Sequence, residues 1–508
     1  MKRQLGTVIA VLALFCVPLT WAQSDSTDSS SSSGSSTSDS SGSSSSVGVP
    51  GVTVGGFTDP SFQTGQTGST DSLQNDSGDG SQTNPDGTQT TTGPQSTFSH
   101  PEQLPPLSMI NDVTKNTGLA LTMNVGTLNN YVWGGKGQGG SYWENLLMTN
   151  GGVYFSQVRP SSLVQLGYTG GVSLTSLTYG NSGYFTTLNQ TGNARILWNF
   201  LPRWQLRIKE NYLYSDDPFA PFVEYVGNPT PNQPTPTVFF PNAVFEQNTA
   251  TADIAYRLSE HDSIDFQGAE SLQHYIRGAG GLWNSYTYAG GGFYQHSFSP
   301  QLAAGGGYNF SALDFGHGQS RAGVQMFEGF VTYKFNPAFS VSGWVGPELT
   351  STKNLFTLTC LPPFGCLVEV IHRQQWDVAE GGTISYFHNA NSIRFMASHS
   401  VSNGGGVLGA VNLYTATIAY ARPLSRVWGF SMAAMYDNSK SISHQIDQYW
   451  NAATGMINFT RKIGESWNAS AYLLFIHQTQ NFYGTPGTSS AAGLGLTLHY
   501  IWGHPLAR

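Results

Sequence analysis

Residues 493–502 read Gly-Leu-Gly-Leu-Thr-Leu-His-Tyr-Ile-Trp, and this stretch decides the fold. Leu494, Leu496 and Leu498 alternate with small or polar residues, and Tyr500 and Trp502 continue the same series. Successive side chains of a β-strand point to opposite faces, so this period of two predicts a strand with one apolar and one small or polar face. Residues 204–209, 253–258 and 428–437 show the same alternation.

The connections between the alternating segments fall into two sets. One set is tight and uses Pro, Asn, Asp and Ser to set turn geometry. The other set is longer and includes the proline-rich segment Asp216–Asn242 and the segment Thr352–His372. Short turns at one end and long loops at the other are typical of a transmembrane β-barrel. The tight turns lie at residues 159–162, 201–203, 259–262, 299–301, 336–338, 388–391, 422–425 and 462–465.

Aromatic residues flank these tight turns, where one interfacial girdle of a membrane barrel would lie. They are Trp198, Phe200, Trp204, Phe298, Phe335, Phe339, Phe387, Trp428 and Trp467.

The turns predict an all-β fold, an antiparallel up-and-down barrel of eighteen strands in which the first strand begins and the last strand ends on the tight-turn side. Sixteen strands are the alternative, because the first pair has the weakest pattern and residues 124–142 are irregular. The strands are predicted near residues 118–132, 148–158, 163–174, 186–199, 204–214, 244–258, 263–274, 285–298, 302–313, 323–335, 339–350, 373–387, 392–401, 412–422, 428–437, 448–461, 467–477 and 490–502.

The composition supports this class and excludes others. Charged residues make up 10% of the 508 residues, against about 25% in an ordinary soluble domain. Glycine (60) and aromatic residues (12 Trp, 24 Tyr and 29 Phe) are abundant. A helical membrane protein needs repeated apolar runs of about 20 residues. A nucleic-acid binder normally has a basic patch, and a propeller has a blade repeat of about 40–50 residues. The chain shows none of these patterns, and a soluble sheet would carry more charge on its outer face.

The N-terminal region is predicted to be separate from the barrel. Lys2 and Arg3, an apolar run from Thr7 to Leu19 and the sequence ending at Ala22 predict a signal peptide over residues 1–22. Residues 23–117 are rich in Ser, Gly, Thr and Pro and predict a disordered tail, which export would leave in the periplasm. The net charge of −8 divides into +2 for residues 1–22, −9 for this tail and −1 for the barrel, residues 118–508.

Two cysteines remain after signal cleavage, Cys360 and Cys366. Export places them in an oxidising compartment, so we expect a disulfide between them. A redox or metal site is the alternative, which the five-residue gap and the lack of neighbouring ligands disfavour.

Residues 118–508 resemble the bacterial outer-membrane β-barrel proteins, including the porins. The segment Leu494–Trp502 is similar to the C-terminal strand that the barrel-assembly machinery recognises in that family, although Gly503–Arg508 follow it here. The tight-turn pattern also resembles barrels found in exopolysaccharide gene neighbourhoods. The resemblance implies a protein of the outer membrane, with its lipid and the assembly machinery as partners.

No catalytic or cofactor motif is evident, and the 12 histidines show no metal-ligand spacing. We therefore expect neither an enzyme nor a cofactor protein. Charges on the inward face of a barrel this wide would line a wet channel, or pair across strands and fill the wall. The candidate pore-lining residues are Arg195, Arg207, Lys209, Asp253, Arg257, Asp265, Gln267, Glu328, Lys334, Asp377, Arg394 and Arg461.

Three acidic residues contradict the simple alternation, since Glu210, Glu270 and Glu380 share the apolar face. Either bulges shift the register or these residues lie inside, and we favour bulges.

The functional expectation is an outer-membrane pore for small polar solutes or for an exported polymer such as a polysaccharide. The alternative is a closed barrel that acts as a surface binding or structural protein through its long loops.

Overall fold

The computed structural model describes residues 118–134, 141–159, 161–177, 184–215, 244–277, 283–316, 318–336, 338–361, 365–388, 391–403, 409–442, 448–464, 466–482 and 485–505. They belong to one compact unit, Val47–Arg508. The predicted signal peptide, the predicted tail and the segment Asp216–Asn242 lie outside the described residues. No helix in the described part of the chain is long and apolar enough to cross a membrane.

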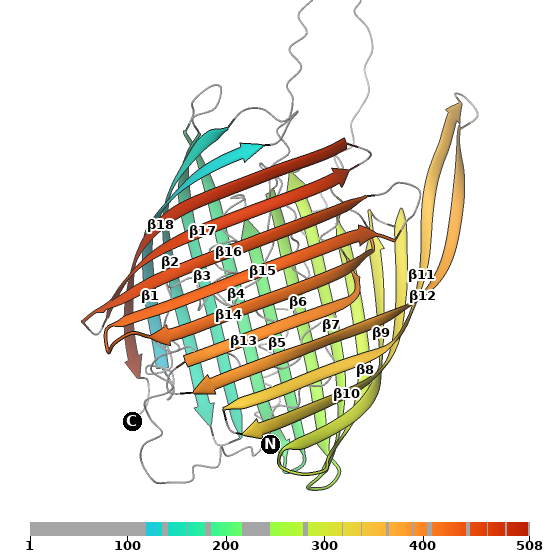
Figure 1. Cartoon of the computed structure of the whole chain (residues 1–508), viewed down its shortest axis with the longest axis horizontal. Helices are drawn as coiled ribbons and strands as arrows, with labels where there is room; N and C mark the ends of the chain where they lie inside the picture. The colour runs from blue at the N-terminus through green and yellow to red at the C-terminus, as the bar shows by residue number, and fades with distance from the viewer. Residues whose placement is uncertain are drawn as a thin grey trace, which may run out of the picture. The chain divides into compact units, whose positions relative to one another are not determined.

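The described residues form one closed antiparallel sheet of eighteen strands (Figure 1). Each strand pairs with the next along the chain, and β18 pairs with β1 from Gly118↔Pro505 to Gly134↔Ser489. The predicted number of eighteen is therefore confirmed. The sixteen-strand alternative is wrong, because β1 and β2 pair without interruption. The strands are β1 Gly118–Gly134, β2 Tyr142–Arg159, β3 Ser162–Leu177, β4 Tyr184–Leu201, β5 Trp204–Ser215, β6 Val244–Arg257, β7 Asp262–Arg277, β8 Ser285–Ser297, β9 Leu302–Phe315, β10 Ser320–Asn336, β11 Phe339–Leu361, β12 Gly365–His388, β13 Asn391–Ser402, β14 Val411–Pro423, β15 Trp428–Ser441, β16 Tyr449–Ile463, β17 Trp467–Phe482 and β18 Thr485–Pro505.

The alternation in the sequence becomes two faces of the wall. Leu494, Leu496 and Leu498 of β18 are 50%, 56% and 41% exposed, whereas the intervening Thr497 and His499 are 8% and 1% exposed. We call the exposed apolar series the outer face and the buried, largely polar series the inner wall. An apolar outer face on a closed sheet is stable in lipid, because every central backbone group is paired and only apolar side chains contact the hydrocarbon.

The two ends of the barrel differ as predicted. The tight-turn end carries the short connections and the pair Gly118–Pro505. Aromatic rings contact each other there on neighbouring strands, for example Trp204 and Tyr256 with centroids 4.4 Å apart, and Trp467 and Tyr500 at 4.7 Å. These contacts form the expected interfacial girdle. We call the opposite end the loop end.

Glycine and aromatic residues are paired across strands on the inner wall. In each pair the glycine is the direct register partner of an aromatic residue, and a Cβ on the glycine would collide with the ring. The rings therefore lie along the wall over the glycines, which is a recognised way to stabilise a glycine in a sheet. The pairs are Gly167–Tyr154, Gly305–Phe330, Gly307–Phe293, Gly381–Trp344 and Gly495–Tyr472.

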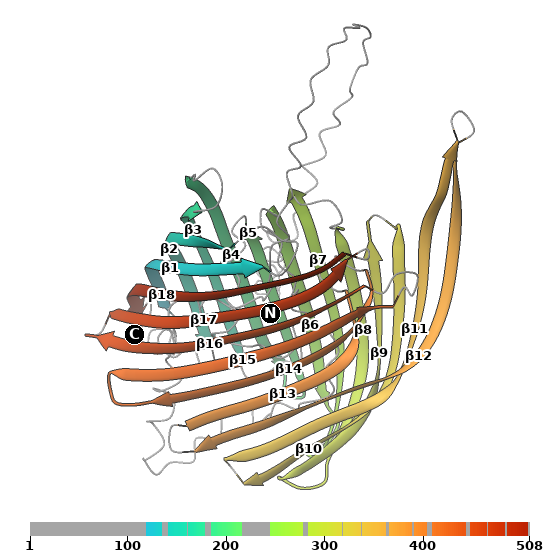
Figure 2. The same ribbon diagram turned by 45° about the horizontal axis from the view of Figure 1, so that its top comes forward.

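The predicted loop Thr352–His372 is wrong. β11 continues to Leu361 and β12 begins at Gly365, so most of this segment is a strand hairpin that extends beyond its neighbours in both views (Figures 1 and 2). Alternating Thr and Val residues, such as Thr357 and Thr359, favour strand over loop because β-branched side chains pack well on a pleated sheet.

The bulges proposed for Glu210, Glu270 and Glu380 are also wrong. The register is continuous around Glu210 and Glu270 between β5, β6 and β7, and around Glu380 between β11 and β12. All three belong to the outer face, where Glu270 and Glu380 are exposed. Glu210 is partly buried and accepts a hydrogen bond from the Asn248 side chain at 3.3 Å. The apolar face therefore contains isolated acidic positions.

Candidate functional site

The inner wall is the largest polar surface that the fold assembles. Threonine, serine, asparagine and glutamine side chains dominate it, and many are almost completely buried, such as Thr287 at 0% and Gln247 at 2% exposure. They come from strand positions that alternate with the apolar outer face, so the period of two places them inside. A polar interior is typical of barrels that enclose water.

One part of the inner wall is apolar instead. Side chains from β1, β2 and β15–β18 form a buried cluster there. It contains Leu128, Val132, Leu146, Met148, Met435, Met456, Tyr472, Leu474, Ile476 and Ala491. The inner wall is therefore not uniformly polar.

The structure places eleven of the twelve predicted pore-lining residues in the inner series, although Arg257 is exposed at the tight-turn end. Arg461 is different. It belongs to the exposed series of β16, and its guanidinium lies 5.3 Å from the centroid of the Trp428 ring. The prediction for Arg461 is wrong, because this side chain joins the aromatic girdle. Whether the other eleven line an open pore stays a prediction.

Six of the predicted residues form one charged group on β4–β7. Arg207 lies opposite Asp253, and Asp253 lies opposite Gln267 on the next strand. The Nη2 atom of Arg207 is 3.5 Å from Oδ2 of Asp265. Arg195 and Lys209 are register partners beside them. The group holds three basic and two acidic side chains, and an ion pair joins Arg207 to Asp265, so its charges largely compensate one another.

A second set of carboxylates lies on β10–β12. Glu348 is opposite Asp377, and it is also opposite Met326, two residues before Glu328. Oε2 of Glu348 accepts a hydrogen bond from the Val401 backbone N–H at 3.4 Å. Both carboxylate oxygens of Glu328 are buried without a hydrogen-bond partner among the described residues.

Three buried carboxylates escaped the sequence prediction, Glu144, Glu348 and Asp437. Glu144 lies in the part of β2 that precedes the predicted strand 148–158. Glu348 and Asp437 lie in segments predicted to be strands, on the face opposite their exposed apolar residues. The alternation around Trp428–Asp437 already placed Asp437 on the small and polar face, so the signal was present. In β11, Pro347 interrupts the pattern just before Glu348.

Side chains at the loop ends of β13 and β15, together with Ala410 just before β14, narrow the interior at the loop end. Val401, Ala410 and Ile442 pack with Phe315 and Val324 on the inner wall of β9 and β10. The Asn403 side chain also lies 3.5 Å from Oγ1 of Thr287 on β8. These contacts join distant parts of the wall through the interior.

The wall has a seam between β12 and β13, where backbone pairing stops before the loop end. β12 pairs with β13 only from Glu380↔His399 to His388↔Asn391. Between Glu380 and the loop end, side chains of β13 and β14 bond to β12 instead. Nδ1 of His399 lies 2.9 Å from the Val378 carbonyl oxygen, and the Asn412 side chain donates to Oδ2 of Asp377 at 3.1 Å.

Cys360 and Cys366 are register partners near the tip of the β11–β12 hairpin. Opposed Cα atoms in an antiparallel pair are about 4.5–5.5 Å apart, which lies within the range that a disulfide spans. The backbone is thus compatible with the predicted disulfide, which stays a prediction.

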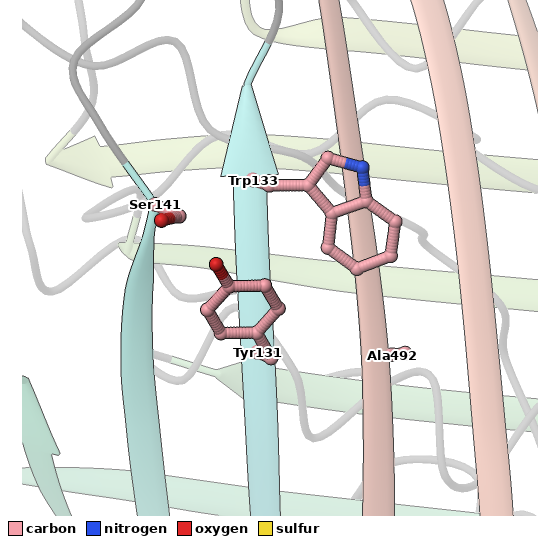
Figure 3. A pocket seen from close by; sticks show the side chains of 4 residues that line it. All are labelled: Tyr131, Trp133, Ser141 and Ala492. Carbon is pink, nitrogen blue, oxygen red and sulfur yellow. The ribbon is translucent and has the colours of Figure 1, made fainter.

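A shallow hollow lies on the outer face near the loop end, between β1 and its neighbours (Figure 3). Tyr131, Trp133, Ser141 and Ala492 line it. The rings of Tyr131 and Trp133 stack with centroids 5.8 Å apart, and Trp143 lies 5.0 Å from Tyr131. These rings correspond to the second aromatic girdle of a membrane barrel.

Neither a protein-family model nor a curated protein matches the chain. Solved structures with a similar arrangement include OccK7 (OpdD) of Pseudomonas aeruginosa, with a TM-score of 0.40 and 10% identity, covering 76% of this chain and 99% of that one. OccK3 (OpdO) of the same organism has a TM-score of 0.36 and 11% identity, covering 79% and 100%. The ferric-catecholate import receptor Fiu of E. coli K12 has a TM-score of 0.37 and 8% identity, covering 76% of this chain and 82% of that one.

TM-scores below 0.5 carry no weight for fold or function, so the assignment rests on the geometry described above. The sheet is closed, antiparallel and even-numbered, with short turns at one end, an apolar outer face and aromatic girdles. These are the defining properties of bacterial outer-membrane barrels. The chain is an outer-membrane β-barrel with porin-like architecture.

Proposed function

We propose that the barrel is a passive channel for small polar solutes. The observation that supports this most is the polar inner wall of a closed eighteen-stranded barrel, since barrels of sixteen to eighteen strands are wide enough to leave an aqueous channel. The contacts of Val401 and Ile442 with β9 and β10 narrow this interior. This narrowing favours small solutes over the exported polymer that the sequence also suggested.

Planar-bilayer conductance and liposome swelling test the proposal. The folded protein should give discrete conductance steps in KCl and let small sugars swell liposomes, with rates that fall as the sugar becomes larger. Heat-modifiable migration on a gel verifies that the barrel is folded. A folded barrel that neither conducts nor swells liposomes would refute the proposal.

A double variant links the conductance to the narrowing at the loop end. Val401→Ala with Ile442→Ala removes apolar contacts that these two side chains make with β9 and β10 across the interior, so conductance or current noise should rise. Val345→Ala is the matched control, because Val345 is 53% exposed on the outer face and should leave conductance unchanged.

A surface binding protein is the second candidate. The hairpin of β11 and β12, which extends beyond its neighbours, is the observation that favours it (Figure 2). A sealed barrel in the bilayer experiment, together with loss of cell-surface binding when the hairpin is shortened, would support this alternative.

A further inference from the structure

Charged side chains on the inner wall lie at different heights along the barrel axis. Apart from the exposed Arg373, the basic side chains described on this wall lie within six residues of the tight-turn end of their strands. Asp253 and Asp265 lie among them beside Arg207, and Glu144 lies near the loop end. Four other carboxylates lie eight to eleven residues from the tight-turn end. At about 2.5 Å of height per residue in a strand tilted by about 40°, the carboxylates are roughly 20–28 Å above the turns. The basic residues are Arg195, Arg207, Lys209, Arg257, Lys334, Arg394 and Lys462, and the four carboxylates are Glu328, Glu348, Asp377 and Asp437.

Asp437 on β15 is the most isolated of these carboxylates. It is 0% exposed, and neither carboxylate oxygen has a hydrogen-bond partner among the described residues. The hydroxyls of Ser439 and Thr454, which are 0% and 3% exposed, also lack partners. Ser439 follows Asp437 on the same face, and Thr454 is opposite Met435, diagonal to Asp437. One carboxylate and two hydroxyls are therefore neighbours on the same face of the sheet, and none of them is bonded to another.

Glu328 on β10 provides a second such position at the same level. It is 5% exposed, with both oxygens unpartnered. Glu348 is its diagonal neighbour across the sheet, which corresponds to a Cβ separation of about 7–8 Å. Thr350, two residues after Glu348 on the same face, is 3% exposed, and its hydroxyl is also unpartnered. Two carboxylates and a hydroxyl thus face the same region.

The chemistry of these positions indicates a monovalent positive charge. All the free atoms are oxygens, and a buried carboxylate must either take up a proton or be compensated by a positive charge or several donors. A cation bound at this position competes with the proton. Water alone hydrates the oxygens but leaves the negative charge uncompensated. The described residues contain no group of three His, Cys, Asp or Glu side chains that could hold a metal ion. A multivalent site is therefore disfavoured, whereas a single alkali cation or ammonium group needs only one or two carboxylates.

We propose that the level formed by Glu328, Glu348 and Asp437 binds monovalent cationic groups, either alkali cations or the ammonium groups of solutes, and makes the channel cation-selective. This rests on the proposed channel function. Cations entering from the loop end meet the carboxylates before the basic residues near the turns.

Reversal potentials across planar bilayers in asymmetric KCl test the selectivity. The wild-type barrel should favour K⁺ over Cl⁻, and the double variant Glu328→Gln/Asp437→Asn should lose most of this preference. Glu270→Gln is the matched control, because it makes the same chemical change on the outer face and should leave selectivity unchanged. Liposome swelling with glucosamine and glucose distinguishes ammonium groups from free alkali cations, since the two sugars differ by one ammonium group.

A conducting barrel that prefers anions, or whose selectivity the double variant does not change, would overturn the inference while leaving the channel intact. A barrel that does not conduct would overturn the proposed channel function. A second measurement, which does not need conductance, then tests cation binding at the carboxylates. The unfolding temperature of the wild-type barrel should be higher in NaCl or KCl than in choline chloride at equal ionic strength. Asp437→Asn should reduce that difference, and equal temperatures in all three salts would refute cation binding.

Discussion

The ring of Tyr472 on β17 lies over Gly495 on β18, its direct partner across the sheet. Tyr472 is 4% exposed, and the space that a Cβ at position 495 would need is filled by its ring. The same arrangement occurs in four other cross-strand pairs of the inner wall. At these five positions the neighbouring aromatic ring occupies the space of a side chain, so the wall requires glycine there.

Gly495→Ala should therefore destabilise the barrel. The added methyl group displaces the Tyr472 ring, and overpacking of this kind costs about 1–3 kcal/mol. Urea unfolding in lipid vesicles, followed by tryptophan fluorescence, measures the change. Gly323→Ala is the control, because a Cβ there has no heavy atom within 4 Å. Equal stability of the two variants would contradict the packing argument.

The seam between β12 and β13 should depend on His399. Its Nδ1–H donates to the Val378 carbonyl, and its ring stacks on Tyr414 with centroids 3.8 Å apart. His399→Ala leaves the carbonyl without this donor, which costs about 1–3 kcal/mol. His399→Phe keeps an aromatic ring but not the hydrogen bond, so comparing the two variants separates the contributions. If both variants unfold at the wild-type midpoint, the seam depends neither on the hydrogen bond nor on the ring stacking of His399.

The ion pair of Arg207 and Asp265 should be sensitive to the loss of one partner. Their side chains are 17% and 16% exposed, and removing one partner of a buried pair costs about 3 kcal/mol or more. We expect Arg207→Gln to destabilise strongly, because both Asp253 and Asp265 lose a positive neighbour. The double variant Arg207→Gln/Asp265→Asn should regain much of the stability. A double-mutant cycle by urea unfolding checks this, and additive effects would argue against coupling.

Glu270 should reduce stability where it is, on the outer face. It is exposed, and no hydrogen bond or ion pair is found for it in the described part of the chain. Because a lipid-facing Glu costs somewhat less than the roughly 2–4 kcal/mol of a basic residue, Glu270→Leu should raise the free energy of unfolding by up to about 2 kcal/mol. Glu210→Leu should gain less, since Glu210 has Asn248 as a partner. Loss of stability in Glu270→Leu would indicate that this face does not contact lipid.

The cysteine pair makes a chemical prediction. Cys360 and Cys366 should resist alkylation in the purified protein until a reductant is added, because their backbone positions are register partners. Mass spectrometry of the alkylated peptides counts the free thiols. Alkylation of both cysteines without reduction would exclude the disulfide.

Local patterns in the sequence were sufficient to predict the strands. Period-two segments such as Leu494–Trp502, bounded by tight turns, predict all eighteen strands and the face that meets lipid, because a strand's side-chain direction is set by its own backbone. The hairpin at Thr352–His372 was missed because its polar and cysteine-containing sequence has the character of a loop, while pairing between β11 and β12 stabilises it as a strand.

The candidate site could be predicted only in part. The alternation of side chains along each strand placed Arg207, Asp253 and Glu328 inside. It could not show that Arg207 pairs with Asp265 or that Glu328 has no partner among the described residues. Those differences depend on register between strands, and a shift of one residue would exchange the two faces. The sequence alone determined that this chain forms a lipid-facing barrel, because alternation is a property of each strand. Only the tertiary structure decided which inner charges are compensated, where the wall opens at Val378 and His399, and what narrows the interior, because these depend on contacts between residues far apart in the chain.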